Sequence, residues 1–213
     1  MKNKHVLIIG SGSSIKKHKR KILKFIDEND IVTFGVNYMT YLCCPDYHLW
    51  TNKQRYRDLG SCINEKSKFL FGCGMGTKLI KKHYNGNYEN IEYVTDLRKA
   101  KKSDYYYEDG KYYGYFRTAG VLAIMIAYYM GAKKISIVGM DGYTLYSRKQ
   151  LLKGKKSHHC YGKGYTDDAS WEKCKKKDAE IYSTLRELRD IGIDFEIITP
   201  TKFKDFYNPN ILK

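Results

Sequence analysis

The chain has 213 residues, 42% of them hydrophobic, with 39 Lys and Arg against 23 Asp and Glu, a formal net charge of +16. This length suits one α/β domain better than two, so we expect a single domain over residues 1–213 with one site. No stretch approaches the roughly 18 apolar residues of a membrane span and no cleavage signal follows the first apolar run, which predicts a cytoplasmic protein.

The first half of the chain alternates short apolar runs with polar connections. A strand is expected at "HVLIIG", followed by the glycine loop "GSGSS" and a helix that continues to about residue 27. Further strands are expected at "DIVTFGVN", "DYHLWTN", "SKFLFGCG" and "NIEYVTD". Residues 98–115 are polar and tyrosine-rich without a period, which indicates a loop or a short hairpin.

The second half continues the alternation of helix and strand. Residues 117–131 are apolar nearly all round and end in glycine, as a buried helix should. A strand at "KKISIVGMD", an amphipathic helix from about residue 168 and a last strand at "DFEIITP" follow. The order predicts a Rossmann-like, doubly wound, mostly parallel sheet with helices on both faces and a lid-like excursion at about 142–166.

The positive charge suits an anionic partner, such as nucleic acid, an acidic membrane surface or a phosphorylated substrate. Its densest run, "KKHKRK" at 16–21, is flanked by isoleucines at helical spacing, which favours a solvated helix face. A nucleic-acid partner is disfavoured because the candidate binding residues follow strands and do not form one basic face. Peripheral contact with the inner face of an anionic membrane and a homo-oligomer stay compatible with the sequence.

The six cysteines, with no signal peptide, favour reduced thiols over disulfides. The chain holds no C-x-x-C pair, and in "SHHCYGKGYTD" the residues His158, His159 and Cys160 are too close together for easy shared coordination. We therefore expect no metal site and no required cofactor.

Ligands of open parallel sheets bind beyond the carboxyl ends of the strands. There Gly10 and Gly12 are able to bring backbone amides against a phosphate at a helix N-terminus. Ile15 stands where a dinucleotide fingerprint has its third glycine, and Asn37 stands where such sites usually place an acid. The alternative is a glycine turn that serves only the course of the chain.

Asn37 and Asn52 both end strands, where an amide is able to contact a base, a ribose or a phosphate, although each is also a common turn residue. The start of the buried helix offers backbone amides beside Arg117 as a second anion site; the alternative is a cap by Thr118 with tight packing at Gly120.

Asp141 follows the strand "ISIVG" and is a candidate to hold a ribose hydroxyl or to orient a neighbouring side chain. No D-x-D pair occurs in the chain, which disfavours sugar transfer that holds its diphosphate through a metal.

Taken in order, these pieces resemble the bacterial sialyltransferases that use CMP-activated sialic acid on a single Rossmann-like domain. More loosely, they resemble the related flagellin-glycosylation and pterin diphosphokinase-like proteins. The similarity spans most of the chain, and the positions that carry it are Gly10, Ser11, Gly12, Ser13, Ser14, Asn37, Asn52, Arg117, Thr118, Ala119, Gly120, Gly139, Asp141, Tyr143, Ser157, His158, Thr166 and Asp167. Three positions depart from the family: Ser11 replaces an asparagine, Ala119 replaces a serine, and Arg117 lies one residue closer to its glycine.

The resemblance implies an inverting glycosyltransferase that moves a sialic-acid-like sugar from a CMP donor to a glycan hydroxyl without a metal. It also implies that His158 is the general base and that Tyr143, assisted by Tyr146 or Tyr161, hydrogen-bonds the leaving phosphate. Two alternatives stay open: a Mg²⁺-dependent diphosphokinase or other nucleotide-binding enzyme of the same superfamily, and a basic module that binds nucleic acid or membranes. Both histidines are also compatible with a surface loop.

Overall fold

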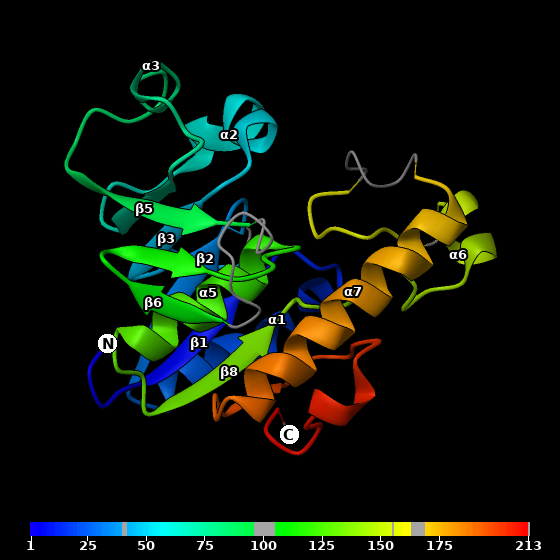
Figure 1. Ribbon diagram of the computed structural model, residues 1–213. Coiled ribbons are helices and arrows are strands. Elements are labelled where there is room, and N and C mark those ends of the chain that lie inside the picture. The colour runs from blue at the N-terminus through cyan, green and yellow to red at the C-terminus, as the bar shows by residue number, and fades with distance from the viewer. Residues whose placement is uncertain (40–41, 96–104, 155, 163–168, 213) are drawn as a thin grey trace.

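The structure is a computed structural model that describes residues 1–39, 42–95, 105–154, 156–162 and 169–212. These residues form an open nine-stranded sheet in the order β6-β7-β5-β4-β3-β2-β1-β8-β9 (Figure 1). Its strands are β1 (His5–Ile9), β2 (Ile31–Val36), β3 (Tyr47–Trp50), β4 (Lys68–Gly72), β5 (Tyr88–Val94), β6 (Tyr106–Glu108), β7 (Lys111–Tyr113), β8 (Lys134–Val138) and β9 (Phe195–Ile197).

All strand pairs are parallel except β6 with β7, which form a hairpin at one edge. The chain leaves β1 toward β2, β3, β4 and β5 on one side and later returns to β8 and β9 on the other. The predicted doubly wound, mostly parallel sheet is therefore confirmed.

Helices cover both faces of this sheet (Figure 1). They are α1 (Ser14–Asp27), α2 (Lys53–Leu59), α3 (Thr77–Ile80), α5 (Ala119–Tyr129), α6 (Arg148–Leu152) and α7 (Trp171–Asp190), with short 3₁₀ turns at η1 (Gly60–Cys62) and η2 (Lys204–Phe206). No helix of the described residues is both long enough and apolar enough to cross a membrane.

Alternating side chains of β1 divide the core into two layers. Val6 and Ile8 pack into the apolar cluster that contains α5 and the buried side of α7. Leu7 and Ile9 pack against α1 on the opposite face. Because both faces of β1 are fully buried, its sequence reads as one continuous apolar run, as central strands of parallel sheets do.

The strands and the long helices lie within a few residues of the predicted ranges. The tyrosine-rich stretch was predicted as a loop or a hairpin, and its described part is the β6–β7 hairpin. The predicted excursion at 142–166 contains the unpredicted helix α6, capped by Ser147 and Gln150, while Thr166 and Asp167 fall outside the described residues.

Candidate functional site

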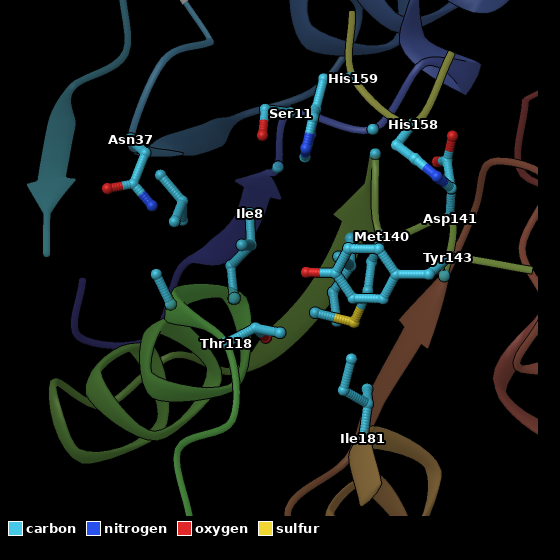
Figure 2. Close-up of a pocket in the computed structure, with 18 of the residues that line it drawn as sticks. Ile8, Ser11, Asn37, Thr118, Met140, Asp141, Tyr143, His158, His159 and Ile181 are labelled. Atoms are coloured by element: carbon cyan, nitrogen blue, oxygen red, sulfur yellow. The ribbon is translucent and has the colours of Figure 1, made fainter. Parts of the chain in front are cut away.

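A cavity of about 120 Å³ opens where β1, β2 and β8 end. Because the chain leaves β1 on one side and returns beside it as β8, this cavity lies at the reversal of strand order, the usual ligand site of open α/β sheets. We call it the switch-point cavity. Its lining includes Gly10, Ser11, Gly12, Asn37, Arg55, Thr118, Ala119, Gly120, Met140, Asp141, Tyr143, His158 and His159. Figure 2 labels Ser11, Asn37, Thr118, Met140, Asp141, Tyr143, His158 and His159 among them.

Asp141 closes the N-terminus of α1. Its carboxylate accepts hydrogen bonds from the Ser14 amide at 2.7 Å and the Ser14 hydroxyl at 2.5 Å, and from the Ser13 hydroxyl at 3.5 Å. Only 4% of Asp141 is exposed, and burial raises the pKa of its carboxyl to about 6, against the opposing effect of the Ser14 and Ser13 hydrogen bonds. Asp141 was expected either to hold a ribose hydroxyl or to orient a neighbouring side chain. The hydrogen bonds show that it orients Ser13 and Ser14.

Four amides of the "GSGSS" loop, those of Gly10, Gly12, Ser13 and Ser14, donate to acceptors within the protein, whereas no described residue accepts from the amide of Ser11, which lines the cavity. Gly10 donates to the Val138 carbonyl at 2.8 Å, and Gly12 donates to the Gly139 carbonyl at 2.9 Å. A Cβ at Gly12 would lie 2.4 Å from the Asp141 carboxylate, so the close approach of the loop to Asp141 requires glycine at this position.

Farther along the same loop, the Ser13 amide donates to the His158 carbonyl at 3.2 Å. Neither Ser13 nor Ser14 lines the cavity. This arrangement differs from the prediction that Gly10 and Gly12 bring their amides against a phosphate, because those amides donate to backbone carbonyls and the Asp141 carboxylate accepts from the Ser14 amide at the N-terminus of α1.

Asn37 is held rigidly at the end of β2. Its backbone is in the left-handed region at φ 50°, and its carbonyl accepts from Nε2 of the buried His48 at 2.6 Å. Its side-chain Oδ1 accepts from the amides of Thr51 and Asn52, both at 3.2 Å. The amide nitrogen is thereby left on the side that faces the cavity (Figure 2).

The predicted role of Asn52 in the nucleotide site is not what the geometry shows. Its side chain caps α2 by accepting from the Arg55 amide at 2.9 Å, and it does not line the cavity. Asn52 reaches the site only through its own amide, which donates to Asn37.

The start of α5 points into the cavity. Thr118 caps this helix by accepting from the Val121 amide at 3.3 Å, and a Cβ at Gly120 would lie 2.7 Å from Met140 Cε, as the packing alternative predicted. No described residue accepts from the amides of Ala119 and Gly120, which line the cavity. The positive end of the helix dipole is thus available to an anion there.

Arg117 does not join this N-terminus as predicted. Its Nε pairs with the Glu180 carboxylate of α7 at 2.5 Å, outside the cavity lining. Tyr146 and Tyr161 also lie outside the lining; Lys156 lies over the ring of Tyr146, and Tyr161 stacks on His159 at 4.9 Å.

Tyr143 is presented to the cavity by a carboxylate of α7. Asp178 accepts from the Tyr143 amide at 2.7 Å, and from the amide and hydroxyl of Thr144 at 2.8 and 2.6 Å. Burial raises the pKa of the Tyr143 phenol, so it stays protonated and is able to donate. The rings of Tyr143 and His158 meet edge to face at 5.8 Å.

The two adjacent histidines sit where the chain returns to the glycine loop. His159 bridges to Gly12, and the Cys160 amide donates to the Ser11 carbonyl at 2.8 Å. His158 and His159 are 9% and 6% exposed, which excludes the surface-loop interpretation, and both line the cavity. Figure 2 shows His158 on the side of the cavity where Asp141 lies.

The sequence did not single out Arg55 or His48. Arg55 reaches the cavity from α2 and donates from Nη2 to His159 Nε2 at 3.1 Å. A charged residue in a short amphipathic helix reads as solvent-exposed, and the only sequence signal for its position is the cap by Asn52 that begins α2. His48 looks like any residue of a buried strand.

The cavity holds few metal-binding groups. Asp141 is the only carboxylate in the described lining, and its oxygens are engaged by serines. The described residues contain no group of three or more His, Cys, Asp and Glu that could hold a metal ion.

No family model matches the chain, and no curated protein matches it in sequence. A solved structure of a mammalian sialyltransferase, in complex with Gal-beta-1-3GalNAc-ortho-nitrophenol, is similar to 93% of this chain and 70% of its own, at 10% identity and a TM-score of 0.48. At this TM-score the likeness carries no argument about the site or its chemistry.

Proposed function

We propose that this chain is an inverting glycosyltransferase that moves a sialic-acid-like sugar from a CMP donor to a glycan hydroxyl. The observation that carries the proposal is the convergence of α5, His158 and Tyr143 on one cavity at the reversal of the sheet. An anion site, an imidazole and a protonated phenol are the groups that displacement of a phosphate by a hydroxyl requires.

In this proposal the donor phosphate lies at the amides of Ala119 and Gly120. The α5 dipole stabilises the charge that builds on the phosphate as the sugar leaves, and the Tyr143 hydroxyl donates to the same oxygens. The Asn37 amide nitrogen offers a donor to the cytidine or the sugar. A cavity of about 120 Å³ is too small to enclose a whole nucleotide sugar, so the nucleoside would lie over the open carboxyl edge.

The chemical step is a single displacement at the anomeric carbon. The acceptor oxygen forms a bond to that carbon as the bond to the phosphate oxygen breaks, and the electron pair leaves with CMP. The hydroxyl proton passes to an imidazole nitrogen of His158, and attack from the face opposite the leaving group inverts the configuration. His158 suits this role because its backbone is pinned by Ser13 beside the cavity.

The lining supports chemistry in which protein donors, not a bridging metal, stabilise the leaving group. A nucleotide with a diphosphate normally brings Mg²⁺ held by protein oxygens, whereas Asp141, the one carboxylate among the described lining residues, already accepts from Ser13 and Ser14. The diphosphokinase alternative therefore lacks support from the donor set.

Thermal-shift measurement against CMP, CDP, UDP, ATP and GTP, with and without Mg²⁺, tests the proposal. A ligand at 100 times its dissociation constant stabilises a protein by about 2.7 kcal/mol, which is readily seen. We expect CMP or CDP to give the largest shift without Mg²⁺. A response to ATP with Mg²⁺ alone would favour the diphosphokinase, and binding of nucleic acid that falls steeply with salt would favour the basic module.

A further inference from the structure

Arg55 is a cation in the switch-point cavity, and no acidic side chain of the described residues pairs with it. Within the described part of the chain its guanidinium makes one hydrogen bond, the 3.1 Å contact from Nη2 to His159, and its Nε is buried without an acceptor. Because a guanidinium is always charged and carries five donors, most of its hydrogen-bonding capacity stays unused.

His159 orients this guanidinium without neutralising it. Its Nε2 accepts from Arg55, so the ring proton is on Nδ1, and the ring also hydrogen-bonds the backbone of Ser11. Burial, with the charge of Arg55 as the next cause, lowers the pKa of His159 to about 3, so the ring is neutral at physiological pH. An Asp or Glu in its place would hold Arg55 equally well but would cancel its charge.

Tyr161 completes the support. Its ring stacks on His159 with an interplanar angle of 3°, and the Arg55 guanidinium carbon lies 5.7 Å from the Tyr161 centroid. The charge is therefore fixed in orientation by a neutral acceptor and an aromatic ring, an arrangement that leaves it free to attract an anion.

The other described residues of the lining offer Arg55 no counter-charge. Asp141 is the only carboxylate in the described lining, and its oxygens accept from Ser13 and Ser14 at the end of α1. The charge of Arg55 also reaches the opposite wall, where it acts to lower the pKa of Tyr143 against the effect of burial. A half-buried cation without a partner is costly unless a ligand neutralises it.

We propose that Arg55 binds an oxyanion of the substrate through its fork of N–H donors, with His159 as the positioning residue that keeps it charged and aimed. The α5 amides form a separate anion site in the same cavity, so the ligand carries two anionic groups or one shared between them. The inference rests on the proposed function in its choice of ligand: a CMP-linked keto-acid sugar carries a phosphate and a carboxylate on the same carbon.

Calorimetric titration of Arg55→Gln tests the proposal, with Arg57→Gln as the matched control. Arg57 lies on the same helix, is exposed and bonds Gln54, so its loss removes the same charge away from the cavity. The probes are cytidine, CMP, CMP-N-acetylneuraminic acid and inorganic phosphate. We expect Arg55→Gln to weaken the binding of an anionic probe by about 10- to 100-fold and Arg57→Gln to weaken it by less than about 3-fold. The affinity for cytidine should not change in either variant.

The pattern of losses identifies the anion. If Arg55→Gln no longer binds CMP more tightly than cytidine, Arg55 contacts the phosphate. If the variant still binds CMP more tightly than cytidine but no longer binds the CMP-sugar more tightly than CMP, Arg55 contacts the carboxylate. Equal effects of Arg55→Gln and Arg57→Gln on every probe would overturn the proposal. If wild type binds neither CMP nor the CMP-sugar, the proposed function is wrong. Inorganic phosphate then tests the oxyanion site by itself: phosphate binding that is lost in Arg55→Gln but kept in Arg57→Gln supports the site, and any other result overturns it.

Two further measurements separate binding from a structural role. His159→Gln keeps a neutral acceptor and should retain anion affinity within about 3-fold, whereas His159→Glu neutralises Arg55 and should lose as much as Arg55→Gln. Without ligand, Arg55→Gln should melt no lower than wild type, with an expected rise of about 2–4 °C from removal of an unpaired charge. A large fall in melting temperature would indicate that Arg55 is structural and would overturn the proposal.

Discussion

The Asp141 carboxylate binds both the amide and the hydroxyl of Ser14, 127 positions earlier in the chain. It acts as the capping group of α1, because the N-cap residue Ser13 makes no side-chain hydrogen bond to the first turn of that helix. These two hydrogen bonds join the loop after β8 to the first residue of α1, so they fix Asp141, which lines the cavity, relative to that helix.

The burial of this carboxylate, which outweighs the effect of its hydrogen bonds on the pKa, predicts an unusual pH dependence of stability. The pKa of Asp141 is raised from 3.8 to about 6, so its contribution to stability is fully present below pH 3.8 and is lost as pH rises through about 6. Between pH 4 and 7 the unfolding free energy of wild type should fall relative to Asp141→Asn by on the order of 3 kcal/mol. Urea unfolding of both proteins across this range measures the difference, and a difference that does not change with pH would contradict the prediction.

Burial of His48 and His159 predicts the opposite pH dependence, in which stability falls as the pH falls. Burial lowers the pKa of His48 to about 4 and that of His159 to about 3. The stability that each neutral ring contributes is present above pH 6.5 and is lost as pH falls below it. In proton NMR spectra their C2 resonances should not move between pH 7.5 and 5.5, with assignment by His48→Gln and His159→Gln. Midpoints near 6.5 would show that the rings are not buried as described.

His158→Ala should reduce sugar transfer by about 10²- to 10⁴-fold while affinity for the CMP donor is largely kept, because the base acts only as the acceptor oxygen attacks. The acid limb of the pH–rate profile should disappear with the imidazole. Asp141→Asn is the control, since a carboxyl of pKa about 6 in the same cavity is able to produce a similar limb. An acid limb that persists in His158→Ala but vanishes in Asp141→Asn would remove His158 as the base.

Asn37 and Asn52 should differ in what their removal changes. Asn52→Ala deletes the α2 cap and should cost about 1 kcal/mol of stability with little change in CMP affinity. Asn37→Gly removes the side chain without strain at φ 50° and should weaken CMP binding by about 1 to 3 kcal/mol. Calorimetry with urea unfolding separates the two effects. A loss of CMP affinity in Asn52→Ala equal to that in Asn37→Gly would restore Asn52 to the site.

Movement of the predicted lid can be followed by hydrogen exchange at two amides whose hydrogen bonds join residues 156–162 to the glycine loop. Ser13 donates to the His158 carbonyl and Cys160 donates to the Ser11 carbonyl, so both bonds must break if residues 156–162 move away. Hydrogen exchange at Ser13 and Cys160 should slow when a CMP-sugar binds. The amides of Tyr143 and Thr144, which are tied to Asp178, serve as an internal reference. Equal exchange at Cys160 with and without donor would argue against a lid.

The centre of the sheet could be predicted from sequence because strands such as β1 and β8 are buried on both faces. "HVLII" is an apolar run after its first residue, "KISIV" is interrupted by Ser136, and each is followed directly by glycine, a pattern that leaves few alternatives to a buried strand. Helix α6 was missed because five residues that include Arg148 and Lys149 show no apolar face.

The site could be predicted only in outline. The predicted ends of the strands indicate which loops line the site, such as the one that holds Asn37. The hydrogen-bond partner of Asp141, Ser14, and the ion-pair partner of Arg117, Glu180, come from distant parts of the chain. Side-chain role depends on those partners, which is why Arg117 was expected at the anion site and Arg55 was not.

The position of β1 between β2 and β8 also bears on how the protein is made. As the chain emerges from the ribosome, β1 is able to pair with β2 early, but its other edge has no partner until β8 follows much later. The walls supplied by Gly10, Asn37 and Arg55 then stand incomplete until the loop after β8 closes over them. A nascent chain should therefore acquire affinity for its ligand only after β8 and the loop that follows it have emerged, so that ligand binding reports that β1 has gained partners on both edges.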